Sequence, residues 1–195
     1  MPVSDSSRAR RFSLPDLADE RVDEAISSFL KGPEQRRGRP GPLSQPGPSA
    51  NPFASLETRI AWMDALRRET ARSIRYRRPS AVMVIAGEAT AATPDAAGWL
   101  GRVAAPIAHV VQRGIRETDL VTRTGEARFQ VLLPETTGRE ATHIAERVMA
   151  DCEIWLQAIQ APISLRASSS GTTAHTTLDA ALARALEALD PGATA

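Results

Sequence analysis

Hydrophobic residues recur at helical spacing in several segments after position 50, and short apolar runs separate these segments. The 3.6-residue period is typical of helices that bury one face, whereas a continuous apolar run is typical of a buried strand. The spacing predicts helices over residues 55–77, 102–116, around 141–149 and 178–189. The apolar runs predict strands over residues 80–86, 120–124, 128–133 and 163–169.

The order of these elements predicts an α/β sandwich with a central, mostly antiparallel sheet flanked by helices. The two short strands around residues 125–127 indicate a β-hairpin, which excludes a simple parallel winding. Gly87 is expected to end the first strand and Pro134 the third. Pro106 is expected in the first turn of the second helix, where its missing N–H costs nothing. Trp62 is expected in the core, and Trp155 at the edge of a helix or loop.

The first 50 residues are expected to form a flexible, disordered arm. Nine of the 17 residues in the stretch 32–48 are Gly or Pro, which is typical of a linker. Before it, apolar residues at helical spacing predict a short amphipathic helix over 16–31. Such a helix needs a partner surface; it either docks on its own domain or stays frayed, or it binds another protein.

Ser13 follows two arginines, a pattern that basophilic kinases recognise. Residues 191–195 are expected to form a C-terminal tail.

Composition narrows the class of protein. The chain has 24 basic and 23 acidic residues and a net charge of +1, so its charge indicates neither nucleic acid nor a membrane surface as a partner. The sequence shows no spanning helix and no secretory signal, which favours a cytoplasmic protein. Cys152 is the single cysteine, and the three histidines (His109, His143, His175) are scattered, so no zinc site is expected.

Three stretches in the correct order resemble the GGDEF family, the diguanylate cyclase domain that joins two GTP molecules into cyclic di-GMP. Asn51–Trp62 (NPFASLETRIAW) resembles the family's DPLTGLPNRRAF, and Arg116–Pro134 (RETDLVTRTGEARFQVLLP) resembles RESDLVARYGGDEFAVLLP without a gap. Leu165–Thr173 (LRASSSGTT) is similar to the strand LTVSIGVA. The resemblance covers about 51–189 and implies the family's fold for a domain over 51–190.

The signature string departs from the family at the positions that carry its chemistry. It reads Gly125-Glu126-Ala127-Arg128-Phe129, so only the first glycine and the phenylalanine remain. The resemblance places Ala127 where the family has a metal-binding carboxylate and Ala86 where it has the second one. Mg²⁺ needs oxygen ligands, and Glu88 and Glu126 are displaced by one or two positions. The sequence therefore predicts a degenerate domain without a metal, a cofactor or cyclase activity.

One family motif is intact. Arg116 and Asp119 match RxxD, five residues before the signature string, where the family binds cyclic di-GMP at an inhibitory site. The resemblance implies that the arginine clamps a phosphate or a guanine edge and that the aspartate accepts a hydrogen bond from guanine. The alternative is an ordinary local ion pair between side chains three residues apart. The site also needs a second arginine, for which Arg113, Arg123 and Arg147 are candidates.

Two functional classes remain open. The first is a catalytically inactive signalling domain that acts as a regulatory or scaffold protein through protein–protein contacts, with the 16–31 helix as a second binding element and with dimerisation as an option. The second is a receptor for cyclic di-GMP that binds through Arg116 and Asp119. Residual cyclase activity is the least favoured class. The run of arginines along the first helix (Arg67, Arg68, Arg72, Arg75, Arg77, Arg78) is expected to be a solvated face or a contact to an acidic partner.

Overall fold

The computed structural model describes residues 22–28, 51–90, 93–173 and 176–190. The chain divides into two units, 1–37 and 38–195. In the first unit, residues 22–28 are helical, which confirms this part of the predicted 16–31 helix. The rest of that prediction, Ser13, the linker 32–48 and the tail 191–195 lie outside the described residues. Within the described residues, no helix is long and apolar enough to span a membrane.

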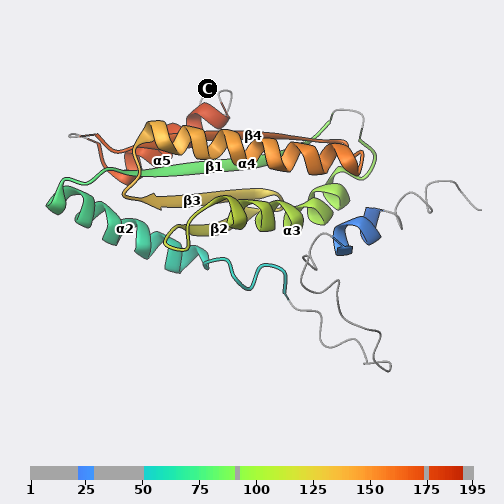
Figure 1. The fold of residues 1–195 in the computed structure, drawn as a ribbon, viewed down its shortest axis with the longest axis horizontal. Helices are drawn as coiled ribbons and strands as arrows, with labels where there is room; N and C mark the ends of the chain where they lie inside the picture. Colours follow the sequence, from blue (N-terminus) through green and yellow to red (C-terminus); the bar gives the residue numbers. More distant parts are fainter. Residues whose placement is uncertain (1–21, 29–50, 91–92, 174–175, 191–195) are drawn as a thin grey trace, which may run out of the picture. The chain divides into compact units, whose positions relative to one another are not determined.

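A four-stranded antiparallel sheet forms the centre of the second unit (Figure 1). Its strands are β1 (Ser80–Ala89), β2 (Leu120–Gly125), β3 (Arg128–Pro134) and β4 (Ile163–Gly171). They lie in the order β2-β3-β1-β4, so β2 and β4 form the two edges. The βαββαβ order with two crossing helices is the split βαβ arrangement. The predicted antiparallel sandwich is therefore confirmed.

Four helices cover the two faces of the sheet (Figure 1). Helices α3 (Ala96–Gly114) and α4 (Gly138–Ala158) pack together on one face, and α2 (Arg59–Tyr76) and α5 (Leu178–Leu189) on the other. Each helix is capped at its start by a side chain that accepts a hydrogen bond from a backbone N–H of the first turn. The capping residues are Thr58 for α2, Asp95 for α3, Thr137 for α4 and Thr177 for α5. These four residues match the usual preference for Thr and Asp at a helix start.

The core between the sheet and the helices α2 and α5 contains Trp62, which is fully buried as predicted. Its indole Nε1 donates to the carbonyl of Leu120 at 3.3 Å, which ties α2 to the edge strand β2. Val82, Val84 and Ala86 of β1 face the same core. Because side chains alternate along a strand, the odd-numbered residues of β1 face α3 and α4.

Three details differ from the sequence predictions. Strand β1 does not end at Gly87 but continues to Ala89, because residues 87–89 still pair with residues 163–165 of β4. Helix α3 begins at Ala96 and not near 102, because Asp95 provides a cap whose Oδ1 accepts from the N–H of Gly98 at 3.2 Å. Pro106 therefore lies in the middle of α3, and its expected place in the first turn is wrong. Trp155 is buried within α4 and does not lie at an edge, because it belongs to the apolar face that α4 turns toward the sheet.

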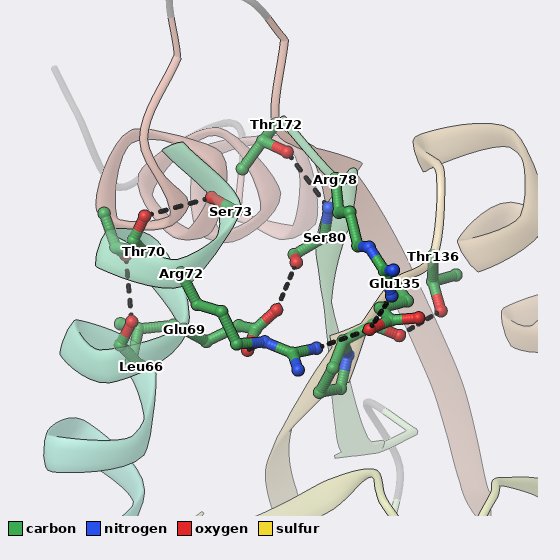
Figure 2. Close-up of polar contacts among 11 residues, drawn as sticks. Leu66, Glu69, Thr70, Arg72, Ser73, Arg78, Ser80, Glu135, Thr136 and Thr172 are labelled. Atoms are coloured by element: carbon green, nitrogen blue, oxygen red, sulfur yellow. Dashed lines mark hydrogen bonds and ion pairs between the residues drawn. The ribbon is translucent and has the colours of Figure 1, made fainter. Parts of the chain in front are cut away.

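A polar network joins α2 to the start of β1 and the end of β3 (Figure 2). Glu69 of α2 is buried, and it accepts from Ser80 Oγ at 2.6 Å and from Arg72 Nε at 2.9 Å. Arg72 and Arg78 both contact Glu135, at 2.8 and 2.7 Å. Arg78 holds the pKa of Glu135 below its usual value. Two arginines of the predicted basic run are thus paired within the chain.

Candidate functional site

The signature residues form the turn between β2 and β3. Glu126 and Ala127 occupy the turn itself, and the register shifts between Arg123 and Gly125, so that Gly125 pairs with Arg128. The shift marks a β-bulge, which is common next to functional sites because it redirects the strand end. Glu126 is exposed on this turn, whereas Phe129 is fully buried behind it.

Ala127 closes the turn against the end of β1. It is only 3% exposed, and its carbonyl accepts from the N–H of Gly87 at 2.9 Å. A Cβ at Gly87 would lie 2.9 Å from the Ala127 methyl, 3.4 Å from Leu165 Cδ2 and 3.5 Å from Leu100 Cδ2. The methyl group therefore occupies a close-packed apolar corner on the α3 side of the sheet.

Ala86 lies one residue from Gly87, yet its side chain belongs to the core on the α2 and α5 side. Successive strand residues point to opposite faces of a sheet. The two positions at which the resemblance places metal-binding carboxylates, 86 and 127, are thus occupied by buried methyl groups on opposite sides of β1. The structure does not bring them together in one cavity.

The charged residues around the turn are paired with one another. Arg128 contacts Asp190 after α5, at 2.8 Å and 3.4 Å, and Glu88 contacts Arg166 of β4 at 3.3 Å. Arg123 donates to the carbonyls of Gly125 and Glu126 at 2.6 to 2.9 Å and lies 4.3 Å above the Phe53 ring. These contacts fix the turn from both sides.

Arg116 and Asp119 form a tight turn just after α3. The N–H of Arg116 donates to Asp119 Oδ2 at 2.8 Å, and the N–H of Asp119 donates to the Arg116 carbonyl at 3.0 Å. The side-chain ion pair considered from the sequence is not formed, because the carboxylate instead caps the backbone of the turn. Asp119 is 7% exposed, and burial raises the pKa of its carboxyl group against the opposing effect of Arg116.

Asp119 Oδ1 is the one buried side-chain oxygen or nitrogen in the described residues that has no hydrogen-bond partner. A cavity of about 220 Å³ lies beside it, lined by Ser55, Glu57, Gln112, Ile115, Arg116, Glu117, Asp119, Leu120 and Val121. Buried polar atoms usually have a partner, so an orphan oxygen next to a polar cavity indicates a place where a ligand or water donates.

The sequence does not reveal the far wall of this cavity. Gln112 Nε2 donates to Ser55 Oγ at 2.9 Å and to the Ser55 carbonyl at 3.3 Å, although 57 positions separate the two residues. Of the three candidate second arginines, Arg147 of α4 reaches the segment before the turn, since its Nη2 donates to the Gly114 carbonyl at 2.5 Å. Arg123 is committed to the signature turn, and Arg113 lies in the last turn of α3.

No group of three or more His, Cys, Asp or Glu side chains that could hold a metal ion occurs in the part of the chain that the structure describes. Glu88 and Glu126 do not replace the missing carboxylates, because Glu88 is paired with Arg166 and Glu126 lies exposed on the turn. The residues present at this end of β1 therefore do not fit a magnesium site.

Comparisons with known proteins agree with the fold. The GGDEF domain of YfiN (TpbB) from Pseudomonas aeruginosa is 28% identical, covers 69% of this chain and 88% of its own, and has a TM-score of 0.58. The GGDEF domain of DgcB from Caulobacter crescentus, in complex with c-di-GMP, is 14% identical over 76% of this chain and 92% of its own, with a TM-score of 0.58. The diguanylate cyclase SiaD from Pseudomonas aeruginosa, in complex with its activator SiaC, is 19% identical over 92% of this chain and 69% of its own, with a TM-score of 0.51.

A search of curated protein sequences finds no match. Residues 52–191 match the family described as "Diguanylate cyclase, GGDEF domain". This match spans most of the chain, and the hairpin and the turn before it lie where the sequence resemblance places them. The chain belongs to the GGDEF family.

Proposed function

We propose that this chain is a regulatory GGDEF domain that does not synthesise cyclic di-GMP and that acts by binding. The observation that carries this proposal is the packing at positions 86 and 127, where two buried methyl groups replace oxygen ligands. A divalent ion in phosphoryl transfer must be held by carboxylates and substrate phosphates in close register. Moving Glu88 or Glu126 into that register requires breaking an ion pair or remaking the turn.

The test is conversion of GTP by the full chain in the presence of Mg²⁺ or Mn²⁺, with cyclic di-GMP quantified by mass spectrometry and an active diguanylate cyclase as positive control. We expect no product above the level without enzyme. Metal-dependent, saturable formation of cyclic di-GMP would overturn the proposal. A variant of this chain with Glu126→Gly is the matched control, because it clears the turn without supplying a ligand.

A protein partner is the first candidate for what the domain binds. SiaD, which has the same fold, is held in a complex with a protein activator. In this chain, the helix at 22–28 has Val22, Ala25 and Ile26 partly buried and its remaining residues exposed, which is the pattern of an amphipathic helix. We expect a partner captured by the full chain to be lost on removal of residues 1–50 and weakened by Ile26→Asp. Capture that is unchanged by both would exclude this helix as the binding element.

The second candidate is cyclic di-GMP itself, received at the turn of Arg116 and Asp119. The observation that favours it is the partnerless Asp119 Oδ1 beside a polar cavity. A guanine N–H donor would satisfy that oxygen, and the guanidinium of Arg116 is suited to a phosphate. Arg147 of α4, whose Nη2 donates to the carbonyl of Gly114 at the end of α3, is the arginine that we expect to assist.

Calorimetric titration of cyclic di-GMP into the full chain tests the receptor proposal. We expect micromolar or tighter binding that Arg116→Ala reduces at least about tenfold, which corresponds to the loss of one charge-assisted contact. Arg68→Ala is the matched control, because it removes an exposed arginine of α2 that does not line the cavity beside Asp119. No heat at high ligand concentration, or binding unaffected by Arg116→Ala, would contradict the receptor proposal and leave the turn as a structural feature.

A further inference from the structure

The outer edge of β4 is an unpaired strand edge in the described part of the chain. β4 lies at the end of the sheet order, with β1 as its one neighbour. Its nine residues, Ile163–Gly171, contain no proline and no lysine. The one charged side chain, Arg166, is turned toward Glu88 of β1 at 3.3 Å. Long edge strands are usually guarded by Pro, Lys or a bulge, because their free N–H and C=O groups recruit another strand.

The backbone hydrogen bonds show which groups of β4 face outward. The N–H of Thr172 donates to the Ser80 carbonyl, and the N–H of Gly87 donates to the carbonyl of Ala127. Since bonding alternates along antiparallel strands, the even-numbered residues of β1 bond to even-numbered residues of β4. The N–H and C=O groups of Leu165, Ala167 and Ser169 therefore point away from the sheet.

The strand is also complementary to a second copy of itself. A two-fold axis at Ala167, the middle residue of Ile163–Gly171, sets the two β4 edges opposite each other. The carbonyl of Gly171 already accepts from Arg184 Nη2 at 3.0 Å, so the new backbone hydrogen bonds come from Leu165, Ala167 and Ser169. In this register, Leu165 faces Ser169 of the second copy, and Arg166 faces Ser168 rather than another Arg166. Like charges are thus not opposed, and the side chains at the axis are small, which lets two edges approach without a clash.

The surfaces next to β4 also favour pairing with a second copy of the chain. A groove of about 430 Å³ runs between α4 and the start of β4, with Leu156, Ile163 and Leu165 among its lining residues. The opposite end of β4 carries Ser169 and Gly171, and Gly138 of α4 packs directly against Gly171. The two-fold axis brings this narrow end of one copy beside the groove of the other.

We propose that two copies of this chain associate through antiparallel pairing of their β4 edges, which forms a continuous eight-stranded sheet. This inference does not depend on whether the domain makes or binds cyclic di-GMP. It assigns a surface distinct from both the signature turn and the turn of Arg116 and Asp119.

Amide hydrogen exchange of the full chain at low and high protein concentration tests the proposal directly. We expect the amides of Leu165, Ala167 and Ser169 to exchange more slowly as concentration rises. The amides of Arg166, Ser168 and Ser170 are the internal control, because β1 protects them at every concentration. Fast exchange of the odd-numbered amides at all concentrations would overturn the proposal. Protection that persists on dilution would also overturn it, since a segment of the same chain would then cover the edge.

A second experiment measures the dimer affinity of one variant by sedimentation velocity. Ala167→Pro removes an outward N–H that makes no hydrogen bond to any of the residues that the structure describes, and Pro is tolerated on an edge strand. We expect it to raise the dimer Kd at least about tenfold, because two hydrogen bonds are lost per dimer. Ala167→Gly, which keeps the N–H, is the matched control. A dimer of unchanged affinity in Ala167→Pro, or a wild-type chain that sediments as a monomer throughout, would contradict the pairing.

Discussion

The turn at Gly125–Phe129 and the turn at Arg116–Asp119 lie close in sequence but differ in what they leave unsatisfied. At the signature turn, Ala127 is packed among apolar side chains, and Arg123 and Arg128 are bound to acceptors within the chain. At the other turn, Asp119 keeps a buried oxygen without a partner beside a cavity. In the first region the two arginines and the Ala127 methyl group are engaged within the chain, whereas in the second a buried acceptor has no partner among the described residues.

The comparison teaches that a family motif has to be judged by the environment of its residues. Alanine at position 127 leaves no hole, because its methyl group lies against Gly87 and the neighbouring leucines. Keeping a carboxylate at position 119 does not by itself create a site, because one of its oxygens caps the backbone of its own turn. What distinguishes the two turns is the second carboxylate oxygen of Asp119, Oδ1, which has no hydrogen-bond partner among the described residues.

The largest expected effect comes from restoring the family's carboxylate. Ala127→Asp places a charge in an apolar, 3% exposed position, and we expect a loss of about 3 kcal/mol in the free energy of unfolding. Glu126→Gly, in the exposed part of the same turn, is expected to change it by less than about 0.5 kcal/mol. Urea unfolding with and without Mg²⁺ measures both. Recovery of the lost stability by Mg²⁺ would show that a metal site can form here and would break the comparison.

Substitutions of Asp119 separate its structural bond from its unused oxygen. Asp119→Ala leaves the Arg116 N–H without an acceptor, so we expect a loss of about 1–2 kcal/mol. Asp119→Asn keeps an acceptor and removes a charge whose burial is unfavourable, so we expect no loss at pH 7. Urea unfolding of both variants checks this difference. Equal destabilisation by Ala and Asn would contradict the assignment of Oδ1 as an unused acceptor.

The pH dependence of the same variants has a defined sign. Burial raises the pKa of Asp119 in the folded state, so the folded chain binds a proton more tightly than the unfolded chain. The contribution of Asp119 to stability is therefore greatest below its unfolded pKa and falls as pH rises through its folded pKa. Asp119→Asn should gain stability relative to wild type as pH rises over this acidic range. A constant difference would contradict the raised pKa.

The pair of Arg128 and Asp190 tests how firmly the signature turn is held. Both side chains are partly exposed, 39% and 26%, so solvent screens the contact and we expect a coupling energy of only about 0.5–1 kcal/mol. A double-mutant cycle with Arg128→Ala and Asp190→Ala measures it. No coupling between the two positions would mean that this contact does not help to fix the turn.

The smallest expected effect is on the stability of Arg116→Ala. The contacts that define its turn use the backbone N–H and C=O of Arg116, which alanine keeps. We expect the free energy of unfolding to change by less than about 0.5 kcal/mol. Thermal unfolding followed by circular dichroism checks this, and a larger loss would mean that reduced cyclic di-GMP binding by this variant reflects altered structure.

Much of the fold follows from periodicity, because the pattern of buried residues directly encodes the faces of helices and strands. The predicted helix 178–189 matches α5 at both ends, and Trp62 lies in the core as expected. The start of α3 differs from the expected one because the apolar pattern weakens before Val103, whereas the helix begins at the cap of Asp95. The first turn in which Pro106 is expected therefore lies ten residues earlier in the structure.

In the candidate site, the sequence likewise locates the positions that are local in the chain but not the contacts between distant segments. Positions 116, 119 and 125–129 are local in sequence, so the family strings located them. The contact between Ser55 and Gln112, the closing of Ala127 on Gly87 and the pairing of Arg128 with Asp190 all join distant segments. Such contacts depend on the packing of α2, α3 and α5 against the sheet, which no local pattern specifies.

The most direct test of the contrast between the two turns is NMR titration of the full chain with GTP and Mg²⁺, following the amide signals of residues 116–129. The account predicts that the signals of Gly125, Glu126 and Ala127 do not shift in a saturable, Mg²⁺-dependent manner, because the turn has neither the space nor the ligands for the nucleotide and its ion. Saturable Mg²⁺-dependent shifts at these three residues would contradict it and would show that the signature turn still accepts the family's substrate.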